Sequence, residues 1–266
     1  MAAREVSYWD ERHAADDSLD TVGWAGLGHA FNAWMYAVRR AVVRRAVRAH
    51  VPLGATTRVL DVGSGTGFYL DLWRELGAGQ VEGSDYSAVA VERLRRARPG
   101  TEIHQLDLAG DPAALPADAY DAVSAMDMLF HIMDPDAYAR AIANLARLVR
   151  LGGHLVMTEN LLADRVESGP AQVSRSEEEI VGLLRASGFE LVAWVPMFVL
   201  LNTPVDSRSR LLHGWWTLLT KVASRHELLG RIAGAAVCPL ELLAVRLARR
   251  GPSTKLLVCR RTAGGR

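Results

Sequence analysis

The amino-acid sequence predicts an α/β protein whose core is a doubly wound, mostly parallel sheet of seven strands. Two observations predict this fold. Short apolar runs typical of buried strands alternate with segments of helical periodicity, and a glycine-rich turn follows the first apolar run. In such folds ligands bind at the carboxyl ends of the strands, so the residues that follow each strand are the candidates for function.

The first strand is expected at residues 59–62, and it leads into the stretch VLDVGSGTG at 59–67. Six further strands are expected at 81–85, 102–106, 121–125, 154–158, 189–195 and 254–259, and helices at 70–76, 88–97, 135–149 and 177–186. Two helix starts are marked by capping residues. Ser87 suits the N-cap of helix 88–97, and Asp134 with Pro135 suits the start of helix 135–149.

Two segments lie outside this alternation and are expected to form a helical cap over the ligand site at the carboxyl ends of the strands. Residues 1–50 include a helix at about 28–50, and its five arginines at 39, 40, 44, 45 and 48 are expected to form a solvated face. Residues 204–250 hold about three helices, with eight basic and three acidic residues. Between them lies the core, residues 51–203, and residues 251–266 supply its final strand and a tail.

Composition excludes several classes of function. The net charge of +1 gives no field that would attract nucleic acid, and two cysteines are too few for a disulfide framework or a thiolate metal site, so no metal is predicted. The first residues, MAAREVSYWDERH, lack the apolar core of a signal peptide, which leads us to expect a cytoplasmic protein. The sequence does not indicate an oligomeric state.

The glycine-rich stretch is not that of a dinucleotide-binding loop. In the pattern G-x-G-x-x-G the third glycine follows two other residues, whereas here Gly67 comes one position early and Phe68 takes its place. Asp61 would repel a pyrophosphate, but it would suit a ligand that carries an ammonium group and a sulfonium.

Four stretches, in order and at the right spacing, carry a family resemblance: VLDVGSGTG, VEGSDYSAVAVERLRRA, QLDLAGDPAALPADAYDAV and ARLVRLGGHLVMTEN. With them the chain resembles the class I S-adenosylmethionine-dependent methyltransferases, in particular those that act on small molecules, over about residues 55–200 and the final strand. The resemblance implies a Rossmann-like sheet and S-adenosyl-L-methionine as cofactor. It departs from the family at Leu151, where proline is usual, and it does not reach 204–250.

The resemblance also implies which residues bind the cofactor. Asp61 and the backbone of the glycine loop would hold its amino acid end; the loop residues are Gly63, Ser64, Gly65 and Gly67. Asp85 would accept from both ribose hydroxyls, and Tyr86 would lie along the adenine. Asp107 and the Leu108 amide would contact the adenine edge, and Met126 completes the set after the fourth strand. Each aspartate also has a structural interpretation, as a turn or helix-capping residue.

Transfer of a methyl group from a sulfonium needs proximity, orientation and a water-poor pocket, and it needs a base only if the acceptor arrives protonated. His131 is the candidate base and Asp127 its orienting partner or an ammonium anchor, although histidine at this position also suits packing. Glu159 and Asn160 are further candidates for the acceptor site.

The sequence therefore predicts a methyltransferase that acts on a small, apolar or bulky acceptor, with oxygen the first choice of methylated atom and natural-product biosynthesis as a setting. One alternative is a cofactor-binding protein that has lost methyl transfer; another is a nicotinamide-dependent reductase. Trp215 and Trp216 are expected in a lid or the core. Contact of 204–250 with a membrane surface is a less favoured alternative, and nucleic acid is disfavoured.

Overall fold

A computed structural model describes residues 10, 23–24, 26–111, 115–162, 166–167 and 172–263. Most of the expected N-terminal segment before residue 23 lies outside the described residues, so only its part from 23 onward can be compared with the cap prediction.

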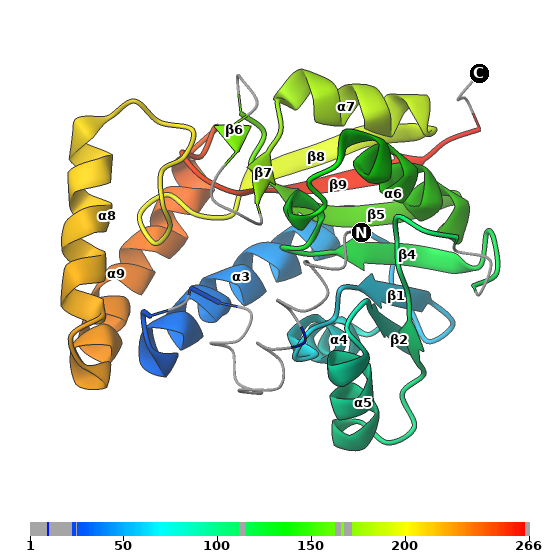
Figure 1. Cartoon of the computed structure of the whole chain (residues 1–266), viewed down its shortest axis with the longest axis horizontal. Helices are drawn as coiled ribbons and strands as arrows, with labels where there is room; N and C mark the ends of the chain where they lie inside the picture. The colour runs from blue at the N-terminus through cyan, green and yellow to red at the C-terminus, as the bar shows by residue number, and fades with distance from the viewer. Residues whose placement is uncertain are drawn as a thin grey trace.

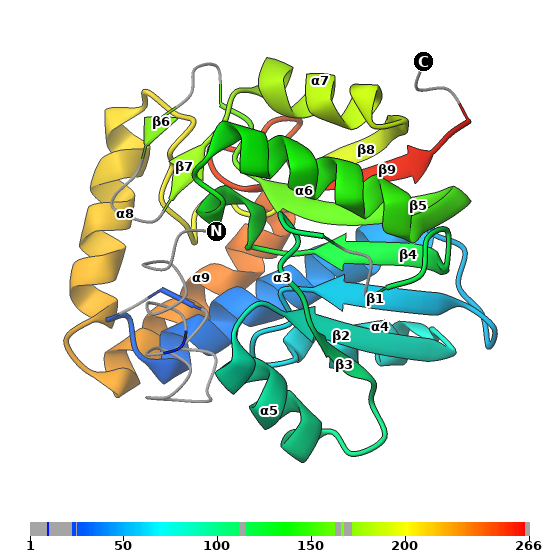
Figure 2. The same cartoon turned by 45° about the vertical axis from the view of Figure 1, so that its right-hand side comes forward.

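Seven strands form one sheet in the order β3-β2-β1-β4-β5-β9-β8 (Figures 1 and 2). Their bounds are Arg58–Val62 (β1), Gln80–Asp85 (β2), Ile103–Gln105 (β3), Tyr120–Ala125 (β4), Val149–Glu159 (β5), Phe189–Pro196 (β8) and Lys255–Arg261 (β9). Strand β9 is antiparallel to both of its neighbours, and the pairs from β3 to β5 are parallel. The predicted fold class is confirmed. Two short strands, Val166–Glu167 (β6) and Val173–Ser174 (β7), pair separately.

Alternate residues of each central strand point to opposite faces, because side chains in a strand alternate with a period of two. Val59 of β1 joins the core beneath α3 (His29–His50), α4 (Phe68–Leu76) and α5 (Ala88–Ala97). Its neighbour Leu60 joins the core beneath α6 (Pro135–Leu148) and α7 (Glu177–Ala186) on the other face. The sheet is thus covered by helices on both sides, as a doubly wound fold requires.

The two predicted capping residues perform that role. The Ser87 hydroxyl accepts a hydrogen bond from the Ala90 amide at 3.2 Å, and the Asp134 carboxylate accepts from the Ala137 amide at 2.7 Å. Pro135 occupies the first turn of α6. Helices α5 and α7 have the bounds that the sequence predicts, and α3 begins one residue after the expected start.

Segment 204–250 contains two helices, α8 (Arg210–Ala223) and α9 (Glu227–Leu247), and not about three as predicted. The error comes from Pro239, which lies inside α9 without ending it. Helix α9 packs along α3, and its first residue anchors that helix: the Glu227 carboxylate accepts from the His29 and Ala30 amides at 2.9 and 2.8 Å. These amides belong to the exposed start of α3, so Glu227 supplies the cap that α3 lacks locally.

Candidate functional site

A cavity of about 670 Å³ opens at the carboxyl ends of β1 and β4, where the order of the strands reverses direction. This is the place at which open α/β sheets bind ligands, and the volume lies in the range of small-molecule sites. One part of the wall is the glycine loop with the residues after β2 and β3. Other parts come from α3, from the start of α4, from the loop after β4, from segments 23–24 and 202–205, and from Asn160, Gln172 and Thr254.

The glycine loop reaches the cavity with positive φ angles of 73° at Gly63, 53° at Gly65 and 84° at Gly67. A side chain at Gly63 would also meet Met128, whose Cγ lies 2.9 Å from the position of a Cβ. Glycine is therefore needed there for both its backbone conformation and its size. Gly63, Ser64 and Gly65 line the cavity; Gly67 does not, and instead forms the N-cap of α4.

The amides of this loop are already engaged inside the protein. Those of Gly63 and Ser64 both donate to the Ser84 carbonyl at 2.9 Å. The Gly65 amide donates to the Asp85 carboxylate at 2.8 Å. A contact between the cofactor and the backbone of these three residues stays a prediction, and their amides would have to share their hydrogen bonds to make it. The glycines of this loop instead allow a ligand to come close to the backbone.

Asp61 lies under the glycine loop and outside the cavity lining, with 1 % of its surface exposed. Its Oδ1 accepts from the Ser124 hydroxyl at 2.5 Å, and Ser124 in turn accepts from the Trp73 indole at 2.8 Å. Its Oδ2 is buried without a hydrogen-bond partner. Burial raises the pKa of Asp61 to about 7, against the opposing effect of the Ser124 hydrogen bond. A direct contact between Asp61 and a ligand thus stays a prediction, whereas its place beneath the loop is a feature of the fold.

Asp85 lines the cavity and also fixes the loops around it. Its Oδ2 accepts from the Gly65 amide, and its Oδ1 accepts from the Ser87 amide at 3.0 Å. A carboxylate oxygen has more than one lone pair, so both oxygens can still accept from a ligand hydroxyl. The predicted ribose contact is compatible with this position. Asp85 also has the structural role that the sequence left open, since it holds the backbone at Gly65 and Ser87.

Three of the remaining predicted cofactor residues line the same cavity: half-buried Tyr86, and buried Leu108 and Met126. Asp107 does not line it. Its carboxylate accepts from the Ala109 amide at 3.0 Å and so forms the turn after β3. Its predicted contact with the adenine stays a prediction.

Asp127, after β4, is held in a buried ion pair that the sequence did not suggest. Its Oδ2 accepts from Nε of Arg39 at 2.8 Å, and the Thr158 hydroxyl donates to its Oδ1 at 3.1 Å. Its φ of 54° is uncommon for a residue other than glycine. Because its charge is already paired, Asp127 suits a positioning role better than that of an ammonium anchor.

Arg39 corrects the prediction that the arginines of α3 form one solvated face. Its side chain is 8 % exposed, and its guanidinium stacks over Tyr36 and Phe198 at 4.9 and 4.8 Å. The signal was present in the sequence, because residue 39 follows Met35 by four and precedes Val42 by three on the apolar face of the helix. The neighbouring Arg40 and Arg44 are 41 % exposed, as predicted.

His131 lies in a 3₁₀ turn, Leu129–His131, and lines the cavity with a half-buried ring. Its ring packs edge to face against Phe130, with 4.7 Å between the centroids. The structure therefore places both predicted catalytic residues, His131 and Asp127, on the wall of one cavity.

The other lining residues, which we call the far wall, were with the exception of Asn160 not identified from sequence patterns. Its apolar and aromatic members are Trp24, Tyr36, Phe68, Tyr69 and Phe130. Its polar members are Asn160, Asn202, Thr203 and Thr254. Asn160, predicted as an acceptor contact, thus shares the wall with three polar residues that were not predicted. These residues come from seven places in the chain and share no motif.

The buried Lys255 fixes this polar wall. Its ammonium donates to the Asn160 carbonyl at 2.6 Å and to the Asp206 carboxylate at 2.5 Å. It therefore joins the end of β5 to the loop at 202–206. Glu159, in contrast, is fully buried behind the wall, where its carboxylate accepts from the Tyr138 hydroxyl at 2.9 Å, and it does not line the cavity. Its predicted place among the acceptor contacts is not supported.

The predicted lid of 204–250 is also not supported. In the described part of the chain, neither α8 nor α9 contributes a residue to the lining, and only Val205 of this segment does. Trp216 reaches the cavity through Trp24, against which it packs edge to face at 5.5 Å. The part of the N-terminal segment that is described does line the cavity, through Trp24 and α3.

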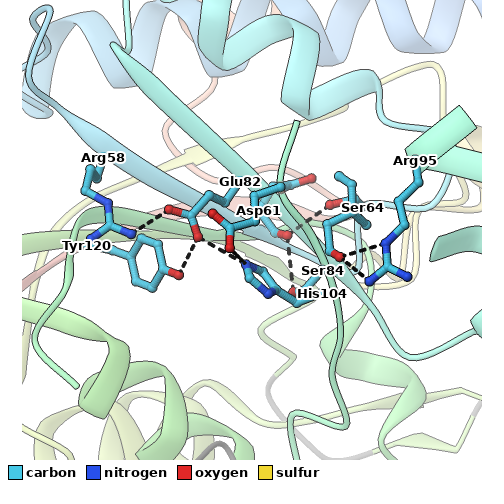
Figure 3. A network of polar contacts seen from close by, with 10 residues as sticks. Arg58, Asp61, Ser64, Glu82, Ser84, Arg95, His104 and Tyr120 are labelled. Atoms are coloured by element: carbon cyan, nitrogen blue, oxygen red, sulfur yellow. Dashed lines mark hydrogen bonds and ion pairs between the residues drawn. The ribbon is translucent and has the colours of Figure 1, made fainter. Parts of the chain in front are cut away.

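A second polar cluster lies on β2 and beside β3, and its residues do not line the cavity (Figure 3). Glu82, Glu102 and His104 come close enough to share a metal ion. However, the Glu82 carboxylate already accepts from Arg58 at 2.6 Å and from the Tyr120 hydroxyl at 2.8 Å, with His104 at 3.1 Å. These contacts account for the burial of Glu82, so the cluster is an ion-pair network of the sheet.

Comparison with known proteins identifies the family to which the chain is similar. A family model described as a methyltransferase domain matches residues 31–194, more than half of the chain. A ubiquinone biosynthesis O-methyltransferase of Xanthomonas axonopodis pv. citri is 39 % identical over 110 residues, 40 % of this chain and 44 % of that protein. A tRNA U34 carboxymethyltransferase of Shewanella putrefaciens is 36 % identical over 130 residues, 46 % and 36 % of the two chains. The chain thus matches less than half the length of these relatives.

Solved structures share the fold over most of the chain. The [4+2]-cyclase SpnF is 25 % identical, with a TM-score of 0.52 over 84 % of this chain and 81 % of the other. An S-adenosylmethionine-dependent methyltransferase from Mesorhizobium loti is 21 % identical, with a TM-score of 0.52 over 82 % and 96 %. The second of these likenesses speaks for the fold alone.

Proposed function

This chain belongs to the class I S-adenosylmethionine-dependent methyltransferases, and on that premise we propose that it methylates a small, apolar acceptor, with an oxygen atom as the site of transfer. The observation that carries the proposal is the continuity of the cavity at the carboxyl ends of β1 and β4. It joins the glycine loop and Asp85 to an aromatic wall within about 670 Å³. One space of this kind can hold a cofactor and an acceptor side by side, which is what direct transfer requires.

S-adenosyl-L-methionine is the cofactor of this family, and the residues at the glycine-loop end fit it. The buried Oδ2 of Asp61 has no partner beneath a loop that a cationic amino acid group would cover. Asp85, with two acceptor oxygens at the end of β2, suits the hydroxyls of a ribose. Apolar Leu106, Leu108 and Met126 suit the faces of a base. When bound, the cofactor supplies an activated methyl group.

The proposed acceptor is apolar or bulky because the far wall is aromatic. Tyr36, Phe68 and Tyr69 pack edge to face on one another at 4.8 and 5.0 Å, and so form a continuous aromatic surface. Burying 100 Å² of apolar acceptor against such a surface contributes about 2.5 kcal/mol. The amide and hydroxyl groups at Asn202, Thr203 and Thr254 offer hydrogen bonds to a polar end of the same molecule.

We assign the removal of the acceptor proton to His131. Asp127 is an unsuitable base, because its carboxylate is paired with Arg39 and accepts from Thr158. His131 places an imidazole on the cavity wall, and histidine is the side chain that most often serves as a general base for a hydroxyl acceptor. Asp127 and Arg39 hold the loop after β4 and the helix α3 together on either side of the site.

The test is turnover of S-adenosyl-L-methionine to its demethylated product with a panel of phenols and hydroxylated polycyclic compounds, with mass spectrometry to detect a gain of one methyl group. His131→Gln should lower kcat by about 100-fold while the affinity for the cofactor stays unchanged. If His131→Gln retains full activity, the base is elsewhere. If no acceptor is methylated although the cofactor binds, the proposal of methyl transfer fails.

One observation favours a second function. The similarity to a cyclase shows that this fold also supports reactions other than methyl transfer. The alternative of a cofactor-binding protein that does not methylate therefore stands as the second candidate. Binding of the cofactor without any turnover, together with conversion of a polyunsaturated substrate at unchanged mass, would favour it. Family membership argues against the nicotinamide-dependent reductase.

A further inference from the structure

Helix α9 is apolar on two opposite sides. One side packs against the protein and buries Gly230, Gly234, Val237, Cys238, Glu241 and Val245. The other side leaves Leu229, Ile232, Leu240, Leu243 and Leu247 between 38 % and 73 % exposed. These five residues recur at spacings of three, eight, three and four, which brings them to one face of a helix with 3.6 residues per turn. An ordinary surface helix would be polar on this side.

Helix α8 repeats the pattern. Leu211, Trp215 and Leu218, four and three residues apart, are 86 %, 36 % and 59 % exposed, while Trp216 and Leu219 are buried. The two helices form a hairpin at one end of the molecule, with α3 between α9 and the sheet (Figures 1 and 2). We call the eight exposed residues of α8 and α9 the hairpin stripe.

The charges around the hairpin stripe have one sign. Arg210 precedes Leu211, Lys221 follows Leu218 by three residues, and Arg246 follows Leu243 by three; all three are exposed. Every acidic residue of segment 204–250 is engaged within the protein. Glu227 caps α3, Asp206 pairs with Lys255, and Glu241 accepts from the Val199 and Leu200 amides at 2.6 Å. The outer surface of the hairpin therefore offers apolar side chains and cations.

Such a surface fits the headgroup region of an anionic bilayer, in which apolar residues enter the acyl boundary and cations meet lipid phosphates. A second copy of this chain fits less well, because its arginines and lysine would face the same positive charges across the interface. We propose that the hairpin stripe docks the protein on an anionic membrane surface.

The helix lies on the membrane and does not cross it. In the described part of the chain α9 alone is long and apolar enough to span a bilayer, by length and composition. Its inner face, however, is part of the fold. Glu241 is fully buried on the loop at 199–201, and a side chain at Gly234 would collide with Trp34 of α3. Crossing the bilayer would break these contacts and expose a carboxylate to lipid.

The experiment is flotation of the full chain with vesicles of phosphatidylcholine containing 30 % phosphatidylglycerol, and with phosphatidylcholine alone. The variant Leu240→Ser/Leu243→Ser removes two half-exposed side chains and should weaken binding to the anionic vesicles by about thirtyfold. The matched control is Leu151→Ser, which removes a leucine of similar exposure, 56 %, away from the hairpin and should leave binding unchanged.

A charge variant tests the electrostatic contribution to vesicle binding. Arg210→Glu/Lys221→Glu should weaken binding to anionic vesicles by at least about twentyfold, and 0.5 M salt should weaken binding of the wild type in the same way. Circular dichroism and cofactor affinity check that each variant is folded. The proposal is overturned if the wild type does not bind anionic vesicles, or if all variants bind them with the same affinity as the wild type. Sedimentation showing a dimer that Leu240→Ser/Leu243→Ser dissociates, with no vesicle binding, would assign the face to a second copy.

Discussion

Asp61 should make binding of the cofactor depend on pH. Burial raises its pKa to about 7 in the free protein, so it is mostly protonated at pH 6 and mostly ionised at pH 8. A bound ammonium group in the loop above it favours the ionised form, and binding must then displace the proton wherever Asp61 carries one. With a pKa of about 7, the ionised fraction rises about tenfold between pH 6 and pH 8. The dissociation constant of S-adenosyl-L-methionine should therefore fall about tenfold over the same range.

Isothermal titration calorimetry checks this directly. At pH 7, titrations in buffers with different ionisation enthalpies should show release of about half a proton per bound cofactor. The variant Asp61→Asn should bind with an affinity that does not change between pH 6 and pH 8. The variant Ser124→Ala removes the hydrogen bond that lowers the pKa of Asp61, so it should move the transition to higher pH. Equal wild-type affinity at pH 6 and pH 8, with no proton release, would refute the electrostatic role of Asp61.

Three further outcomes follow from buried charges. Arg39→Met removes the ion-pair partner of Asp127, which keeps its hydrogen bond from Thr158, and should lower the free energy of unfolding by about 1.5–3 kcal/mol in urea denaturation. The control Arg44→Met should cost at most about 1 kcal/mol; equal losses would contradict the role of the Arg39–Asp127 pair. Burial raises the pKa of Glu159 to about 7, so its contribution to stability is full below pH 4.5 and is lost as the pH rises to 7. Glu159→Gln should remove up to about 3 kcal/mol of that loss. If the free energy of unfolding in urea changes between pH 5 and pH 8 by the same amount in wild type and variant, this role of Glu159 is excluded. Asp206→Asn weakens the tie between Lys255 and the loop at 202–206 and should raise the acceptor KM with cofactor affinity unchanged; an equal rise in the dissociation constant of the cofactor would show a global effect.

The sequence predicts the glycine-loop end of the cavity well because this end is local. Gly63 and Met126 directly follow a strand and Asp85 ends one, and the carboxyl ends of neighbouring parallel strands lie together whatever the loops do. The periodicity of buried strands and the capping residues Ser87 and Asp134 then place the elements to within a few residues. What the motif does not reveal is which hydrogen bonds are already used, since that depends on the pairing of Ser84 with the loop.

The far wall could not be predicted in the same way. Arg39, Asn202 and Thr254 are distant in the sequence, and each lies in a segment whose local pattern fits an ordinary helix, loop or strand end. Only the packing of α3 across the sheet brings Arg39 to Asp127. The lid prediction failed for a related reason. The apolar composition of 204–250 indicates that these helices have apolar faces. It does not indicate that two of those faces point away from the cavity.

The connection between α9 and α3 decides what membrane docking would change. Glu227 of α9 holds the start of α3, and α3 presents Tyr36 and Arg39 to the cavity. Because these helices are packed along their length and tied by side chains such as Trp34, whose indole donates to the Arg231 carbonyl at 3.1 Å, docking would move them as one body. The cavity would then keep its shape on the membrane, and kcat for a water-soluble acceptor should be the same with and without anionic vesicles. For an acceptor that partitions into the bilayer, vesicles should instead lower the apparent KM, since the enzyme and its substrate share one surface. A rise in kcat for the soluble acceptor would contradict the rigid connection and show that docking rearranges α3.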